Sequence, residues 1–279
     1  MNIPRREVDF GFEPGQVPLD WANNDAFETT FLNALSLLFP EGEKFFVESV
    51  KQHRQFVKDP QLAADVKGFM GQEAMHGREH RAFNELMLSH GYTIGPAVEA
   101  NLRAFLKRVR RTLSPASQLA VTCALEHFTA MLAESLLKDE RIRDELDPTV
   151  RGLWLWHALE ESEHKAVAFD VYEAAGGTYE RRVAIMLLTT IVFFAVTWFV
   201  QARLMATRGI LWKPWTWLRG LARLYVYPGH LTRLIPAWLS YFRPHFHPDD
   251  RDTRELLARW EKTLFGARGE LREQLKLSA

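Results

Sequence analysis

The sequence has little of several residue types and patterns, and each shortage excludes a class of protein. Its 279 residues include one cysteine, Cys123, which excludes an internal disulfide and a cysteine-based metal site. Its formal net charge is zero, which argues against a general nucleic-acid binder. No stretch alternates convincingly between polar and apolar residues, so little β structure is expected.

Two further shortages are local. The N-terminal stretch MNIPRREVDFGFEPG lacks the apolar core of a secretion signal, so a cytoplasmic location is the starting expectation. Residues 181–248 contain nine Arg or Lys, no Asp or Glu, and five of the nine tryptophans. This change in composition follows Gly176 and Gly177, which can end a helix. The sequence therefore predicts a helical bundle at residues 1–177 and a basic, aromatic helical region at residues 178–279.

Helical periodicity dominates the rest of the chain. Hydrophobic residues make up 47% of the sequence, which is enough for a sizeable core. A proline-rich lead at residues 1–20 is expected to be irregular, and Pro40 either kinks the first helix or begins a second segment that ends near residue 57. Helices are predicted at residues 23–38, 59–90, 97–112, 115–138 and 148–175. Four long helices with short connections predict an all-α, four-helix bundle.

The inward-facing stripe of each long helix carries ionisable residues near its middle. Residues that recur in steps of three and four face the interior of a bundle. Glu160 and Glu163 lie off these stripes and are expected to be solvated. The stripes place the following residues in the core: Glu43 on the first helix; Glu73, His76 and His80 on the second; Glu126 on the next long helix; and His157, Glu161 and His164 on the last.

Several carboxylates in one apolar core need compensating positive charge. Removing a single charge from water costs several kcal/mol even after relaxation, and no Lys or Arg lies on these stripes. Two helices with Glu-x-x-His, plus one Glu from each of two others, form the ligand pattern of ferritin-like dimetal proteins. The alternative is a bundle in which Glu and His form internal salt bridges. The predicted ligands of a metal pair are Glu43, Glu73, His76, Glu126, Glu161 and His164.

Two other histidines extend this set. His157 lies one turn before Glu161, and the resulting His-x-x-x-Glu-x-x-His pattern resembles the helix of dinuclear iron N-oxygenases, in which an extra imidazole joins the metal cluster. His157 is therefore a seventh predicted ligand, and the alternative is a buried histidine that only supports a ligand. His80, one turn past His76, is expected to contact a ligand or line the active-site cavity. His127 points away from the stripe and is expected to be structural.

Four segments are similar to the bacterial family described as predicted metal-dependent hydrolases, which belongs to the ferritin-like helical proteins. These segments are NALSLLFPEGEKFF, FMGQEAMHGREH, EHFTAMLAE and WHALEESEHKAVAFDVY. The resemblance covers roughly residues 5–245 and implies that the six Glu and His positions of the ferritin-like pattern bind metal. The word hydrolase in the family's description is itself a prediction, and the ligand chemistry favours iron and dioxygen.

A long apolar run opens the basic C-terminal region. Residues 183–200 are 18 residues without a charge, preceded by Arg181 and Arg182 and followed by Arg203. As a helix this run spans roughly 27 Å, just short of the hydrocarbon thickness of a bilayer. The mixture of Trp, Tyr, Leu and Arg after it suits an anionic membrane surface. We expect a peripheral or single-pass protein on the cytoplasmic side of a membrane; the alternative is a buried fifth helix in a cytoplasmic protein.

Together these features predict a dinuclear enzyme that oxidises a hydrophobic or lipid substrate with dioxygen. Its metals are expected to be two iron ions, with manganese or another divalent metal as alternatives. An external electron donor is needed, because the chain has no nucleotide-binding glycine motif and no cysteine cluster. The alternative function is a metal-dependent hydrolase that uses a metal-bridging hydroxide as nucleophile. No nucleic-acid partner is expected, and the sequence leaves the catalytic residues, the substrate and the oligomeric state open.

Overall fold

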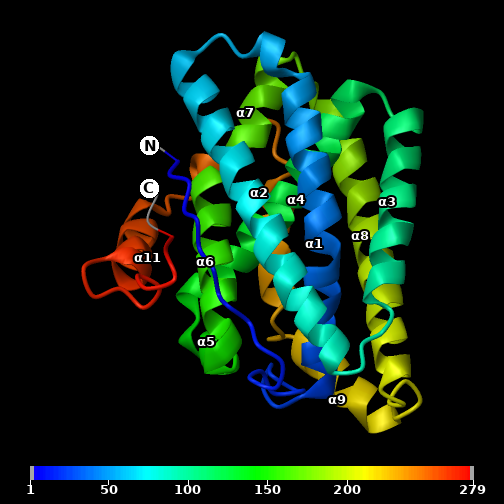
Figure 1. The fold of residues 1–279 in the computed structure, drawn as a ribbon. Coiled ribbons are helices and arrows are strands. Elements are labelled where there is room, and N and C mark those ends of the chain that lie inside the picture. The colour runs from blue at the N-terminus through cyan, green and yellow to red at the C-terminus, as the bar shows by residue number, and fades with distance from the viewer. Residues whose placement is uncertain (1–2, 277–279) are drawn as a thin grey trace.

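The computed structural model describes residues 3–276 and is all-α, as predicted (Figure 1). Within those residues, β pairing is limited to two isolated bridges, Val8–Leu275 and Ala22–Leu146. The α-helices are α1 (Ala26–Gln52), α2 (Pro60–Ser89), α3 (Gly95–Thr112), α4 (Pro115–Lys138), α5 (Glu140–Asp144), α6 (Pro148–His164), α7 (Val167–Ala174), α8 (Tyr179–Thr207), α9 (Pro214–Tyr225), α10 (Ile235–Ser240) and α11 (Arg254–Phe265). Short 3₁₀ helices lie at η1 (Arg54–Phe56), η2 (Thr232–Leu234) and η3 (Pro248–Asp250).

The long helices begin at the polar residues that precede their first turns. The side chain of Asp25 accepts hydrogen bonds from two backbone N–H groups at the start of α1. Asp59 also accepts two at the start of α2, and Ser114 and Asp147 accept one each at the starts of α4 and α6. Each of these three residues is followed by a proline at the first helical position. Such caps satisfy N–H groups that have no partner inside the helix. The predicted starts of these three helices are therefore confirmed.

The first helix, α1, continues through Pro40 without a break. A proline inside a helix leaves the carbonyl four residues earlier without its N–H donor, and here that carbonyl belongs to Ser36. The side chain of Asn84 on α2 donates a hydrogen bond to it at 3.0 Å. Because α2 replaces the lost donor, α1 is one helix of 27 residues rather than two segments.

The predicted helix at 148–175 is interrupted. It divides at Lys165 and Ala166 into α6 and α7. The ammonium group of Lys165 donates to the carbonyl of Arg251 at 2.6 Å and to the hydroxyl of Thr253 at 3.1 Å. The prediction of a single helix was wrong at these two residues, where the side chain of Lys165 contacts the C-terminal region.

Helices α1, α2, α4 and α6 enclose a common interior, with α1 packed on α2, α4 packed on α6, and contacts between the two pairs (Figure 1). Helix α8 lies along α1 and α4, and α9 crosses the N-terminal end of α1. There Gly220 touches the ring of Phe27, where any Cβ would collide with the ring. The boundary between the two predicted domains and the ferritin-like relationship stay predictions. Residues 1–2 and 277–279, the outer ends of those domains, lie outside the described residues.

The beginning and end of the described chain lie side by side (Figure 1). The backbone N–H of Asp9 donates to the carbonyl of Gln274 at 3.0 Å, and that of Lys276 donates to the carbonyl of Glu7 at 2.8 Å. The lead between residue 3 and Asp25 forms no helix, as expected. It runs along α6 and α2, which places its side chains beside the interior cluster described next.

Candidate metal centre

The ionisable residues predicted to face the core meet in the interior of the four helices. Each is at most 5% exposed, although together they carry four carboxyl groups. They come from α1, α2, α4 and α6, and the structure brings all of them into one cluster: Glu43, Glu73, His76, His80, Glu126, His157, Glu161 and His164. Their role as ligands stays a prediction, but their convergence is a property of the fold.

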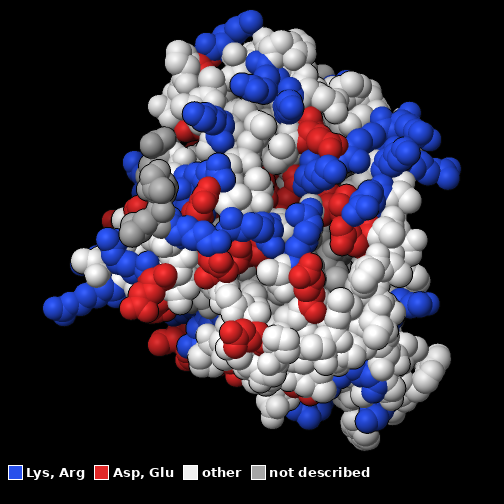
Figure 2. Space-filling view, in the orientation of Figure 1, with Lys and Arg blue, Asp and Glu red and all other residues white. Residues whose placement is uncertain are grey.

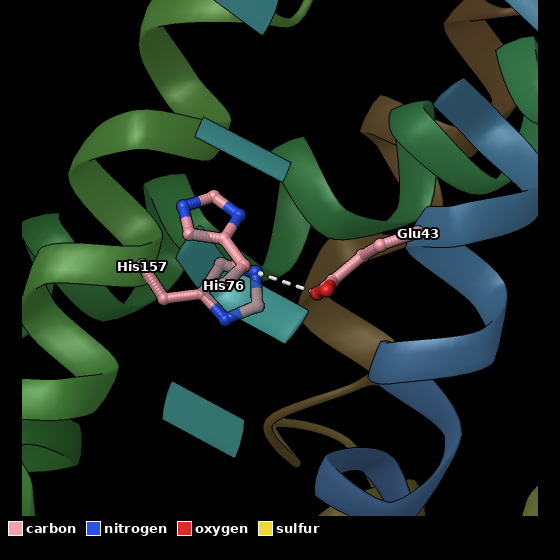
Figure 3. Close-up of side chains that lie close together, drawn as sticks. All are labelled: Glu43, His76 and His157. Carbon is pink, nitrogen blue, oxygen red and sulfur yellow. Dashed lines mark ion pairs between the residues drawn. The ribbon is translucent and has the colours of Figure 1, made fainter. Parts of the chain in front are cut away.

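The cluster contains two sets of three side chains that each point at one spot. Glu43, His76 and His157 form the first set (Figure 3), and within it one ligand atom per residue lies within 4.8 Å of the others. Glu73, Glu161 and His164 form the second set by the same criterion. Such sets of carboxylate oxygens and imidazole nitrogens are able to hold divalent metal ions.

Glu161 connects the two sets. Its Oε1 lies 3.5 Å from Nδ1 of His76, and its Oε2 lies 3.6 Å from Nε2 of His164. Glu126 joins the second set, with Oε2 at 3.5 Å from the same His164 nitrogen. Gly77 makes room for this arrangement, because its missing Cβ would lie 3.3 Å from Oε2 of Glu43. The geometry therefore suits two neighbouring metal positions with Glu161 between them.

The inward-facing polar atoms of the cluster fit a cation. No hydrogen-bond partner exists among the described residues for either oxygen of Glu43, Glu73 and Glu126. Oε2 of Glu161, Nδ1 of His76 and Nε2 of His164 are also without one. Buried polar atoms are almost always paired, and no Lys or Arg of residues 3–276 forms an ion pair with these four carboxylates. Each of the six Glu and His residues of the ferritin-like pattern therefore has at least one polar atom without a hydrogen-bond partner in the part of the chain that the structure describes.

The histidines of the two Glu-x-x-His motifs are each held by one ring nitrogen. Nε2 of His76 lies 3.0 Å from Oε2 of Glu160, and Nδ1 of His164 lies 2.9 Å from Oε1 of Gln72. If each of these nitrogens carries the proton, the other nitrogen presents its lone pair to the carboxylates. Metal-binding histidines are commonly oriented in this way by a carboxylate or carbonyl oxygen.

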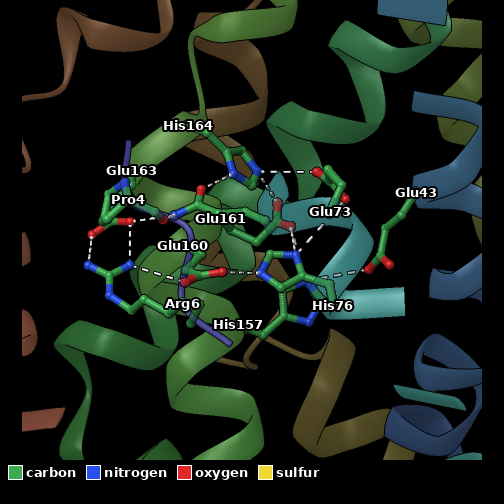
Figure 4. Close-up of polar contacts among 12 residues, drawn as sticks. Pro4, Arg6, Glu43, Glu73, His76, His157, Glu160, Glu161, Glu163 and His164 are labelled. Atoms are coloured by element: carbon green, nitrogen blue, oxygen red, sulfur yellow. Dashed lines mark hydrogen bonds and ion pairs between the residues drawn. The ribbon is translucent and has the colours of Figure 1, made fainter. Parts of the chain in front are cut away.

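A buried arginine from the N-terminal lead supports both anchors (Figure 4). The guanidinium group of Arg6 donates to Glu160 at 3.1 Å and to the two oxygens of Glu163 at 2.7 and 2.8 Å. Glu163 in turn accepts a hydrogen bond of 2.8 Å from the amide of Gln72. The expectation that Glu160 and Glu163 are solvated was wrong, because Arg6 compensates their charge inside the protein and leaves Glu160 with no exposed surface.

A second chain of hydrogen bonds orients His157. The hydroxyl of Ser36 donates to Asn84 at 2.7 Å, so its oxygen is free to accept from Nδ1 of His80 at 2.8 Å. Nε2 of His80 then accepts from Nδ1 of His157 at 2.7 Å. In this tautomer, Nε2 of His157 and Oε1 of Glu161, 3.0 Å apart, both present lone pairs. This supports the ligand role of His157 and the supporting role expected of His80. His127 is structural, as expected, and contacts the carbonyl of Ala237.

The pKa values of the cluster residues are shifted because several carboxyl groups are buried close together. Burial raises the pKa of Glu43 to about 8 and raises the pKa of Glu73, which also faces Glu126, well above its ordinary value. Burial alone would lower the pKa of His76, but Glu160 and Glu161 raise it to about 10. Burial, together with the neighbouring His76, lowers the pKa of His157 to about 4. Without a metal, the cluster therefore attracts protons, and a cation would compete for the same charge.

A cavity of about 140 Å³ leads from the cluster toward the protein surface. His157 and Glu161 line its inner end beside Phe39, and its walls include Leu35, Ala133 and other apolar side chains of α1, α4 and α6. The space is partly enclosed and almost entirely apolar apart from its two ends. A substrate that reaches the cluster by this route must therefore be hydrophobic.

The fold and this site define an all-α protein with a buried, carboxylate-rich cluster that is able to hold metal ions. The chain belongs to the family of predicted metal-dependent hydrolases, whose model matches residues 4–252. No curated protein and no solved structure gives a significant match to the chain. The family supports metal dependence and the hydrolase alternative; it gives no support to oxidation by dioxygen, and the identity of the metal is not established by the match.

The sequence did not reveal the residues that hold the histidines. Gln72 and Glu160 directly precede the predicted ligands Glu73 and Glu161. This adjacency was the one feature of the sequence that could have indicated their role in orienting the histidines. Arg6 gave no such signal, because it lies in an irregular segment 154 residues before Glu160. Only the fold brings this arginine to the centre.

Proposed function

We propose that the protein is a metal-dependent hydrolase that cleaves an ester of a hydrophobic substrate at this cluster. The observation that supports the proposal most strongly is a cluster of unpartnered carboxylate and imidazole atoms that meets the inner end of an apolar cavity at Glu161. A bound metal ion would polarise the ester carbonyl and lower the pKa of a water molecule, which is the chemistry that hydrolysis requires. Family membership supports the same reaction class.

The protein's own residues have three tasks in this reaction. Glu160 and Gln72 hold His76 and His164 in the orientation that ligation needs. The apolar cavity walls exclude bulk water and bring only a hydrophobic substrate to the centre. In the overall reaction, a water oxygen bonds to the acyl carbon and the ester C–O bond breaks. The proton that the water releases ends on the leaving alcohol oxygen, and this transfer takes place beside His157 and Glu161, which line the inner end of the cavity.

A second candidate is the oxidation of a hydrophobic substrate with dioxygen at a di-iron centre. One observation favours it: the set of Glu43, His76 and His157 combines one carboxylate with two imidazoles. That donor combination is typical of non-haem iron sites that use dioxygen. It would need an external electron donor, as the sequence predicts.

Metal substitution separates the two reactions. The metal-free protein is reconstituted with zinc, manganese or iron and assayed under argon with a hydrophobic ester. Hydrolysis with redox-inert zinc supports the first proposal, because no electron transfer is then available. A ferrous form that is inactive under argon but gains a visible absorption band and consumes dioxygen in air supports the second and contradicts the first.

The surface of α8 and α9 supports a membrane as the source of the substrate. Helix α8 is long and apolar enough to cross a bilayer, and 28% of its most apolar 18-residue stretch is buried. One face packs on α1 and α4, while Ile191 and Phe199 on the other are exposed. Trp212 and Trp215 around the start of α9 are 89% and 72% exposed. In Figure 2, the lower right end of the molecule, where α8 and α9 meet, is mostly white with patches of blue.

We propose that this face lies in the interface of an anionic membrane rather than spanning it, because α8 is covered by protein on one side. Exposed tryptophans favour the interfacial region, and the acid-free composition of residues 181–248 suits anionic lipids. Sedimentation with vesicles tests this. Binding to phosphatidylglycerol-containing vesicles that weakens with added salt is expected. Equal recovery of the protein in the supernatant with and without such vesicles would contradict it.

A further inference from the structure

The cavity follows the long helices from the metal centre to the end of the molecule where α9 lies. On α1 it is lined from Phe39, one turn from Glu43, to Glu28. These two lining residues are eleven positions apart, which corresponds to about 16 Å along the helix axis. On α4 it is lined from Thr129, one turn from Glu126, to Leu136. The space is thus long and narrow, with the cluster at its inner end.

Most of this space is lined by apolar side chains. The inner end has His157 and Glu161, with Thr129 and Trp154 close by, and Ser135 lies on α4 beside Leu136. The other walls of the middle section are Leu, Phe and Ala side chains, which offer no partner to a hydroxyl, an amide or a charge, and burying such a group there without a partner would be costly. The middle section therefore favours hydrocarbon.

The outer end has a polar collar beside the exposed apolar face. Glu28, Glu145 and His230 lie there, and Arg223 of α9 forms ion pairs with both carboxylates, at 2.7 Å to Glu28. The same segment continues to Tyr227, which is 80% exposed. Arg223 offsets part of the negative charge of this collar. The collar is a short polar ring between the hydrocarbon-lined cavity and the surface that we place in the membrane interface.

We infer that the cavity binds one unbranched acyl chain of a lipid-derived ester, with the ester group at the metal centre and the chain extending outward to the collar. This deepens the proposed hydrolase function and rests on it. Because the cluster is buried at the inner end, the ester must enter first, and only a small alcohol part fits ahead of it. The substrate class is therefore a single-chain fatty acyl ester of a small alcohol, and a lipid with a bulky headgroup or two chains on one glycerol is excluded.

Blocking the cavity at two depths tests this inference. Ala133 and Leu136 line the cavity on α4 at about 10 Å and about 15 Å from the level of Glu126 along the helix axis. The variants Ala133→Phe and Leu136→Phe are compared with Ala64→Phe, an exposed position on α2. Each is assayed in the full-length, metal-loaded protein with methyl esters from acetate to palmitate, and the released acid is titrated.

The wild type is expected to prefer long chains. Ala133→Phe should lose at least tenfold in kcat/KM for the long esters, about 1.4 kcal/mol, while keeping the short ones. Leu136→Phe should move the cut-off to longer chains, and Ala64→Phe should match the wild type. A graded cut-off is not produced by general misfolding. Equal activity on all chain lengths in all four proteins would overturn the inference and leave the hydrolase proposal standing.

A binding measurement keeps the test independent of the reaction. Displacement of a fluorescent fatty-acid probe is measured with the metal-free, full-length wild type and the same variants. Weaker probe binding in Ala133→Phe than in Ala64→Phe supports the acyl-chain site even where no ester is cleaved, in which case the hydrolase proposal alone fails. Probe binding that is absent in the wild type, or unchanged in both cavity variants, overturns the inference.

Discussion

The interior cluster and the α8–α9 surface are opposites, because the cluster buries polar groups and the surface exposes apolar ones. The cluster removes carboxylates and imidazoles from water, and several of their atoms have no hydrogen-bond partner among the described residues. The α8–α9 surface leaves large apolar side chains such as Ile191, Phe199 and Trp212 in contact with solvent. Both arrangements are costly for a protein alone in water. A cation would lower the cost of the first arrangement and a lipid interface that of the second, which is why we propose a different partner for each region.

Removing a ligand should have the largest effect, because it breaks the cluster directly. The variant Glu73→Ala is expected to abolish metal binding, since Glu73 lies at the centre of the second set of ligand atoms. Elemental analysis of the purified protein measures this. Glu85→Ala, an exposed position on the same helix, is the matched control. Wild-type metal content in Glu73→Ala contradicts the ligand assignment.

The pH dependence of stability should distinguish the metal-free protein from the metal-loaded one. The folded-state pKa of Glu43 is raised to about 8 by burial, so this carboxyl binds its proton more tightly in the folded chain than in the unfolded chain. Its contribution is fully present below pH 4.5 and is lost as the pH rises through 8. The metal-free protein should thus lose on the order of a few kcal/mol over this range from Glu43 alone.

Metal should reverse this trend, because its binding displaces the protons and becomes tighter as the pH rises. Chemical denaturation of both forms between pH 5 and pH 8 provides the measurement, with the chelated protein as the reference. A metal-free protein whose stability increases over this range would show that the carboxylates are already compensated by other groups.

Removing the arginine that supports the histidine anchors should have a smaller effect. Arg6→Met leaves Glu160 and Glu163 buried without their partner, and outer contacts of this kind typically change metal affinity by about 10- to 100-fold. Arg5→Met is a close control, because Arg5 is the neighbouring residue and its side chain is 53% exposed. Competition with a chromogenic chelator measures the affinity. Equal affinities in the two variants would show that the histidines do not need Arg6.

The smallest effect is expected on the exposed surface. Replacing Trp212 and Trp215 by alanine should weaken binding to anionic vesicles by about tenfold per tryptophan, consistent with partial burial of each ring in the lipid interface. Metal content should not change. Phe56→Ala, an exposed aromatic position just after the C-terminal end of α1, is the control. Unchanged vesicle binding in the tryptophan variants would separate the exposed face from any membrane function.

The sequence predicted the residues that follow a helical repeat better than those that do not. Glu73 and His76 lie on a stripe of α2 that is otherwise apolar and recurs in regular steps of three and four residues. The fold class and the convergence of the cluster were therefore predictable from this periodicity. The starts of α2, α4 and α6 followed from local capping residues. Each of these signals lies within one helix, where the geometry of neighbours in sequence is fixed.

Features that depend on contacts between distant segments were not predictable. Asn84 of another helix supplies the donor that Pro40 removes from α1, and Lys165, at the break between α6 and α7, donates to a carbonyl 86 residues later. The burial of Glu160 depends on Arg6, which the irregular lead carries. In each case a polar side chain compensates a group far away in sequence, and periodicity contains no information about that partner.

The position of Arg6 also has a consequence for how the protein is made. Its guanidinium group lies 5.0 Å from the ring of Phe265 and 3.7 Å from a carboxylate oxygen of Glu261, both on α11. The lead that carries it pairs with residues 274–276. During synthesis on a ribosome, the lead emerges long before the helix that covers it. Mature metal affinity should therefore arise only after translation has passed α11, which makes metallation a late event in the maturation of the chain.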